Sequence, residues 1–227
     1  TNNQSLLCAT SNGLYRTING GTTWTQEQTG DFSQGSVRFK PNDPTIVYAT
    51  TKNRFYKSTN TGDTFTNITS GLSTAAQTNR MILDVTPADN TYVYVLSING
   101  SNALNGIYRS TNSGGSFTKT SGTTDVLEST QGWYDLALAV SNTNKDLVFT
   151  GCLNIWKSSN GGTAVTKVNN WSSPNSAPYT HADIHHLQYL NGKLFCLSDG
   201  GIYVSSDDGS NFTDLTAGLQ ISQFYRA

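Results

Sequence analysis

The sequence predicts an all-β fold, a β-propeller built from four-stranded antiparallel blades. The first reason is an eight-residue stretch that occurs five times, with first residues at positions 17, 58, 110, 158 and 205. These positions differ by 41, 52, 48 and 47 residues, and such a period is typical of propeller blades. The second reason is composition, because 11 tyrosines, 21 glycines and abundant Thr, Ser and Asn suit short strands and turns. The third is that no window shows a helical period.

The repeated stretch predicts a hairpin turn. Each copy has a hydroxyl residue first, Asn or Asp third and Gly fifth, and four copies have an aromatic residue eighth. Asn and Asp bond to the backbone two residues on, and Gly adopts positive φ without steric cost. Apolar runs precede each copy and strand-like runs follow it, so the eighth residue re-enters the sheet. We therefore expect the aromatic eighth residues to be buried at equivalent places: Trp24, Phe65, Phe117 and Phe212.

The turns place the blades in order along a single domain, 1–227. The expected blades are about 1–30, 31–72, 78–122, 131–170 and 179–219. The second blade shows the layout of four strands, with strand-like runs at 36–40, 46–50, 55–58 and 65–68. The first strands of the later blades are expected at 82–86, 135–140 and 181–189.

The first blade lacks a first strand, and 220–227 looks like the first strand of a next or a closing blade. The chain is therefore a ring of about five blades or a segment of a larger propeller. We favour the segment, because neither end of the sequence looks like a natural domain end.

The repeated stretch resembles the Asp-box, or BNR, repeat of sialidases, sortilin-type receptors and xyloglucanase-type glycoside hydrolases. The family pattern is S-x-D-x-G-x-T-W, and its third position is occupied here by Asn19, Asn60, Asn112, Asn160 and Asp207. In those families the box is an outer turn away from the active site, so the resemblance implies a structural role for these five residues.

A narrower resemblance covers residues 131–227. The stretches 131–140, 154–158, 179–185, 198–203 and 220–226 are similar to propeller segments of large secreted Bacteroidota proteins, which typically carry a type IX secretion sorting domain. This likeness implies export, and a surface rich in Thr, Ser and Asn with 13% charged residues also favours a secreted or cell-surface protein.

Charge and hydropathy exclude other classes. A formal net charge of −1 gives no sign of nucleic-acid binding, and no run of about 18 apolar residues predicts a membrane span. The three cysteines, Cys8, Cys152 and Cys196, cannot all pair internally, and we expect reduced, unpaired thiols that act as small buried apolar residues.

Candidate binding residues lie on or beside the expected first strands, which line the central channel of a propeller. Alternation on a strand would place His181, Asp183 and His185 on one face. The sequence leaves open whether they form a structural polar network, a divalent metal site completed by a neighbour such as Asp135, or a ligand contact. The candidate residues for ligand binding at the channel mouth are Arg80, Trp133, Tyr134, Asp135, His181, Asp183, His185 and Tyr225.

The function predicted is a non-catalytic secreted or cell-surface module that binds a glycan or a protein, for example in adhesion. No cofactor is expected apart from the divalent ion just considered, and further domains of a longer parent chain are expected partners. The alternative is a segment of an Asp-box glycoside hydrolase, in which Asp135 and Asp183 would be the acidic pair. A carboxylate pair at glycosidase separation in an open cleft would favour the enzyme, and a plugged channel would favour the binding module.

Overall fold

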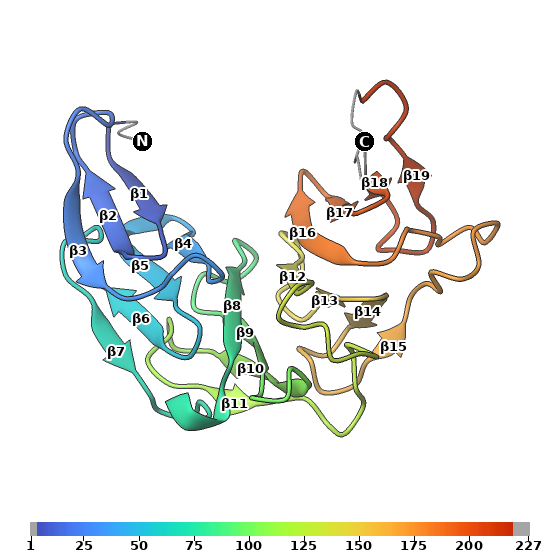
Figure 1. Ribbon diagram of the computed structural model, residues 1–227, viewed down its shortest axis with the longest axis horizontal. Coiled ribbons are helices and arrows are strands. Elements are labelled where there is room, and N and C mark those ends of the chain that lie inside the picture. Colours follow the sequence, from blue (N-terminus) through green and yellow to red (C-terminus); the bar gives the residue numbers. More distant parts are fainter. Residues whose placement is uncertain (1–3, 220–227) are drawn as a thin grey trace, which may run out of the picture.

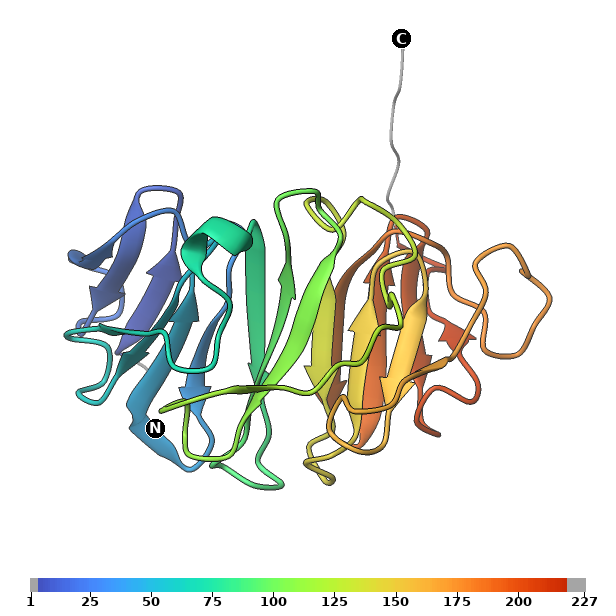
Figure 2. The ribbon, with the colours of Figure 1, turned by 90° about the horizontal axis from the view of Figure 1, so that it is seen from below.

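Residues 4–219, described by the computed structural model, form five antiparallel sheets set side by side around an open arc (Figure 1). The all-β propeller prediction is confirmed, and the one helical element in the described residues is a short 3-10 turn, η1 (Ala75–Gln77). Seen from the side, the sheets stand next to one another with their strands roughly upright (Figure 2). No helix within 4–219 is long and apolar enough to cross a membrane.

Each sheet is one blade, and its strands pair in chain order. Blade 1 contains β1 (Leu6–Ala9), β2 (Gly13–Thr17) and β3 (Thr25–Thr29). Blade 2 contains β4 (Val37–Lys40), β5 (Asp43–Thr50), β6 (Phe55–Ser58) and β7 (Thr66–Ile68). Blade 3 contains β8 (Arg80–Val85), β9 (Val93–Ile98), β10 (Leu104–Ser110) and β11 (Thr118–Lys119). Blade 4 contains β12 (Ala137–Val140), β13 (Val148–Gly151), β14 (Ile155–Ser158) and β15 (Thr166–Lys167). Blade 5 contains β16 (Ile184–Leu190), β17 (Lys193–Ser198), β18 (Gly201–Ser205) and β19 (Thr213–Asp214).

The inner strands β4, β8, β12 and β16 face the middle of the arc, and the last strand of each blade lies at its rim (Figure 1). Blade 1 has three strands, and its β1 corresponds to the second strand of the others. The register shows this, because Cys8 on β1 pairs with Tyr15 just as Cys196 on β17 pairs with Tyr203. The inner edge of β1 therefore has no strand partner within 4–219.

The apolar core lies between blades. Inner strand β12 shows how: Leu138 and Val140 pack with side chains of blade 3, and Ala137 and Ala139 pack with those of blade 5. Because successive side chains of β12 point to opposite faces, both faces of this strand are buried. Within residues 4–219, four such clusters join the five blades in sequence, from blade 1 to blade 5.

The five repeated turns share one set of hydrogen bonds. In the third, the Ser110 hydroxyl donates to Asn112 Oδ1 at 2.8 Å and accepts from Gly114 N at 2.9 Å, and Asn112 Oδ1 accepts from Ser116 N at 3.0 Å. Gly114 has φ of +70°. The same three bonds recur in the turns that begin at Thr17, Ser58, Ser158 and Ser205. Residues at the third position therefore hold the turn, as expected.

The expectation that the aromatic eighth residues are buried at equivalent places is correct for Phe117 and wrong for Trp24. Phe117 is buried and its ring lies 4.8 Å from that of Phe55 in the preceding blade. Phe65 and Phe212 are half-buried, and 43% of Trp24 is exposed. The eighth residue packs against the preceding blade, and no blade precedes the one that carries Trp24 within the described residues.

The burial of the cysteines also depends on whether a neighbouring element covers them. All three are unpaired, as predicted, and Cys152 and Cys196 are buried. Cys8 is exposed, contrary to expectation, although it occupies the same register position as Cys196. The inner strand that covers that position in blade 5 has no counterpart in blade 1.

Candidate functional site

The candidate site lies where the inner strands of blades 3, 4 and 5 begin. Arg80 is the first residue of β8, while Trp133, Tyr134 and Asp135 lie shortly before the start of β12 at Ala137. Because β12 lies beside both β8 and β16, these residues meet the start of β16 at one mouth of the arc. A central cavity of about 100 Å³ reaches this mouth and is lined by His185, with Arg80 and other residues of the inner strands.

The outer layer of the site is an aromatic surface formed by Trp133, Tyr134 and His185. The rings of Trp133 and Tyr134 lie 5.5 Å apart and are 53% and 46% exposed. Tyr134 meets the His185 ring edge-on at 4.8 Å, and His185 Nε2 is 2.6 Å from Asp199 Oδ1. The Asp199 contact orients the imidazole, so three rings are held together on an accessible face.

Arg80 supports this surface from below. Its Nη1 donates to the carbonyl oxygens of Gly132 and Tyr134, each at 3.1 Å, and its Nε donates to Gln34 O at 3.4 Å. Burial lowers the pKa of Arg80, and the charge of Asp135 opposes that shift. The guanidinium therefore fixes the loop that carries the aromatic pair.

Beneath the aromatic surface lies an acid pair, Asp135 and Asp183. Asp135 is fully buried, and Gln131 Nε2 reaches Asp135 Oδ2 at 3.5 Å and Asp183 Oδ1 at 3.4 Å. Cys152 Sγ is 3.8 Å from Asp135 Oδ2. The other oxygen, Asp135 Oδ1, has no hydrogen-bond partner among the described residues. An unpartnered buried oxygen is costly when it carries charge.

The environment of Asp135 favours its protonated form. Burial raises the pKa of Asp135 to about 6, and the charge and hydrogen bond of Asp183 act in the same direction, while His185 opposes them. The nearby Asp183 carboxylate thus adds to the effect of burial on the pKa of Asp135. Burial also raises the pKa of the neighbouring Cys152 thiol to about 11, so this thiol stays neutral.

The shared-face prediction for His181, Asp183 and His185 is wrong. Strand β16 begins only at Ile184, Asp183 has φ of +58°, and the register shifts between Ile184 and His186. His181 precedes the strand, is exposed, and has Nδ1 3.0 Å from Ala182 O. The structure brings Asp183 and His185 to the site and leaves His181 outside the aromatic surface and the acid pair.

The metal hypothesis for those three residues finds no geometric support. Within 4–219, no group of three or more His, Cys, Asp or Glu side chains is arranged to hold a metal ion. The last predicted binding residue, Tyr225, lies outside the described residues.

Two residues of the site were missed by sequence reasoning. Gln131 bridges the acid pair, and Asp199 orients His185. Asp199 lies in the turn between β17 and β18, at the same end of its blade as the start of β16. A polar residue in the turn between the second and third strands of a blade is therefore the sequence signal that points to Asp199.

Comparison with solved structures supports the propeller fold. The chain is similar to the GH74 enzyme of Niastella koreensis, with a TM-score of 0.66 and 20% identity over 91% of this chain and 35% of that one. It is similar to YCF48 bound to D1 peptide, with a TM-score of 0.56 and 16% identity over 93% of this chain and 64% of that one. It is also similar to the extracellular domain of the putative hybrid two component system BT4673 from B. thetaiotaomicron, with a TM-score of 0.61 and 19% identity over 93% and 26%.

These likenesses concern the fold alone. The chain spans less than two thirds of the length of each of these three structures. No family model matches the sequence, and no curated protein does. Propellers of this shape thus occur both in enzymes and in domains whose descriptions name no reaction.

Proposed function

We propose that the chain is a non-catalytic propeller module of a secreted or cell-surface protein and binds its ligand on the aromatic surface. The observation that carries the proposal is the exposed pair Trp133 and Tyr134, 53% and 46% accessible yet held in place by Arg80 beneath the loop. Large aromatic rings that stay exposed on a fixed loop mark an interaction site.

The ligand favoured by this surface is a glycan, with a protein as the other class. Sugar rings present apolar faces that stack on flat aromatic side chains, and their hydroxyls pair with groups such as the His185 imidazole and the Asp199 carboxylate. The proposal includes kinship with Asp-box propellers and with secreted Bacteroidota proteins, supported by the five identical turn hydrogen-bond sets and by the sequence likeness of 131–227.

Glycan binding can be tested by screening the 227-residue chain on immobilised glycans and measuring hits by calorimetry, with xyloglucan oligosaccharides included. Trp133→Ala should weaken binding at least tenfold, because one stacked ring is lost. Trp171→Ala is the matched control, since Trp171 is 49% exposed but precedes blade 5 on a separate loop. Equal binding by the Trp133 variant and the wild type would refute the site, and binding of peptides only would select the protein class.

The alternative is a segment of a glycoside hydrolase, and the acid pair is the observation that favours it. A carboxyl with a raised pKa beside a second carboxyl is the composition of a glycosidase site. Against it, the Asp135 carboxyl is fully buried, whereas a glycosidase presents both carboxyl groups to the bound sugar. Release of reducing ends from xyloglucan that is abolished by Asp135→Asn and by Asp183→Asn would establish the enzyme instead.

A further inference from the structure

Three carboxyl groups gather beside the aromatic surface. The backbone N–H of Asp199 donates to Asp183 O at 3.3 Å, so the turn that carries Asp199 lies against the residue before β16. Gln131 links Asp183 to Asp135, because its Nε2 lies 3.4 Å and 3.5 Å from an oxygen of each carboxyl group. Asp135, Asp183 and Asp199 come from three separate segments of the chain and meet at one mouth of the arc.

These carboxyl groups outnumber the cations that face them. Burial, and then the charges of Asp183 and Asp199, raise the pKa of Asp135, while the His185 charge opposes them. The other cation that faces Asp135 is Arg80. Above pH 6, three carboxylates therefore oppose two cations even when His185 is protonated. The mouth keeps an excess of negative charge, which attracts a positively charged ligand.

Part of this negative charge remains without a partner. The Asp199 side chain is 37% exposed, and its Oδ2 accepts no hydrogen bond from residues 4–219. Asp135 is fully buried, and its Oδ1 also lacks a partner in that range. Because an uncompensated carboxylate is costly near the protein interior, a cation bound at the mouth would stabilise the cluster by its charge.

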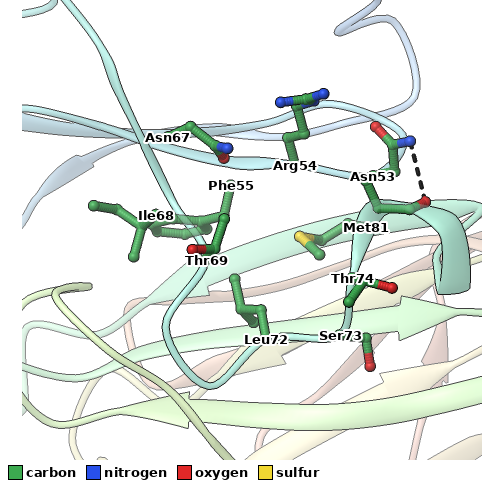
Figure 3. A pocket seen from close by; sticks show the side chains of 11 residues that line it. Asn53, Arg54, Phe55, Asn67, Ile68, Thr69, Leu72, Ser73, Thr74 and Met81 are labelled. Carbon is green, nitrogen blue, oxygen red and sulfur yellow. Dashed lines mark hydrogen bonds between the residues drawn. The ribbon is translucent and has the colours of Figure 1, made fainter.

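A pocket between blades 2 and 3 is larger than the cavity at the mouth but lacks this chemistry (Figure 3). Its volume is about 210 Å³, and Ile68, Leu72 and Met81 surround its apolar space. No Asp or Glu is among the described residues that line it. The exposed carboxylate beside exposed aromatic rings thus distinguishes the channel mouth from this pocket.

We propose that the aromatic surface binds glycans whose sugars carry a free amino group. The inference rests on the proposed function and names the ligand class of the same site. An ammonium group above the ring of Trp133 or Tyr134 gains cation–π attraction, and it can donate to the unpartnered oxygen of Asp199 beside the rings. The flat face of the sugar stacks on the same aromatic side chains.

Three β-1,4-linked tetrasaccharides that differ only at carbon 2 test the inference. The glucosamine tetramer carries an amino group there, the N-acetylglucosamine tetramer an acetamide, and cellotetraose a hydroxyl. In calorimetry at pH 6.5, the glucosamine tetramer should bind at least tenfold more tightly than each of the other two. Raising the salt concentration from about 0.05 M to about 0.5 M should remove most of this preference, because salt screens exposed charges.

Variants connect the preference to the carboxylates at the mouth. Asp199→Asn should reduce it from at least tenfold to below threefold, because the amide can still accept from His185 but carries no charge. Asp183→Asn removes a neighbouring charge and should also reduce the preference. Asp63→Asn is the matched control and should leave the preference unchanged, since Asp63 is an exposed carboxylate that pairs with Arg16 on the surface.

Equal affinities for the three tetramers would overturn the inference, and so would equal losses of preference in the Asp199 and Asp63 variants. A tetralysine peptide that binds as tightly as the glucosamine tetramer, with the same loss in Asp199→Asn, would assign the cation to a protein ligand and overturn it too. Neutral tetramers bound at Trp133 without any preference would leave the proposed function standing and overturn the inference alone. If no glycan binds, or if Trp133→Ala binds glycans as the wild type does, the proposed function fails as well.

Discussion

At the scale of single residues, the pKa of Asp135 links the candidate site to the stability of the protein. Its carboxyl is buried, one oxygen has no partner among the described residues, and its pKa is raised from 3.8 to about 6. A folded-state pKa above the unfolded value means that this group stabilises the fold most below pH 4. That contribution is lost as the pH rises through 6.

We expect Asp135→Asn to be more stable than the wild type at pH 8 by about 1–3 kcal/mol, since a shift of one pKa unit corresponds to about 1.4 kcal/mol. The difference should shrink as the pH falls from 8 to 4. Urea unfolding across this range measures it. Asp63→Asn is the control, because the Asp63 side chain is 58% exposed and pairs with Arg16 on the surface. Parallel profiles for wild type and Asp135→Asn would contradict the assignment.

At the scale of elements, each repeated turn returns a side chain to the blade before it. Phe117 reaches the Phe55 ring of blade 2, and Val165 packs partly buried against the cluster between blades 3 and 4. Trp24 occupies the same turn position in blade 1 and stays 43% exposed. The turn therefore adds stability only where a preceding blade receives the side chain.

Truncation to alanine should distinguish a turn side chain that packs against a preceding blade from one that does not. Phe117→Ala should lower the unfolding free energy by about 3–5 kcal/mol, as expected for a buried aromatic residue. Trp24→Ala should cost less than about 1 kcal/mol. Chemical denaturation of both variants provides the comparison, and equal losses would show that burial does not decide the effect.

The secondary-structure elements also show which features of the fold the sequence predicts. The turns could be predicted because their hydrogen bonds lie within eight residues, and the strands could be predicted from the runs beside them. The shared face of His181 and Asp183 could not, because a left-handed residue and a register shift interrupt the alternation before β16.

At the scale of the whole molecule, the inner edge of blade 1 has no strand partner within residues 4–219. Position for position, Cys8 and Cys196 are equivalent, yet the first is exposed and the second is buried. Burial raises the pKa of Cys196 to about 12 and that of Cys152 to about 11, whereas Cys8 meets solvent.

Thiol titration of the native protein at pH 8 should therefore detect one rapidly reacting cysteine, and denaturation without reductant should reveal three. Cys8→Ser should remove the rapid phase and leave two thiols after unfolding. A native count of zero would show that β1 is covered in solution, and a native count of three would show that the blade interfaces open readily.

The repeated turn has a consequence for how such chains diverge. In the turn at Asn112 the side-chain amide donates to the Ser116 hydroxyl at 2.9 Å, and in the turn at Asp207 the direction is reversed, with Asn211 donating to the carboxylate at 2.7 Å. The third and seventh residues of the turn therefore form a hydrogen-bonded pair, and donor and acceptor can exchange places if both residues change together. Every one of these hydrogen bonds joins residues of the same short turn. The turn can therefore persist while the sequence of the rest of the blade changes.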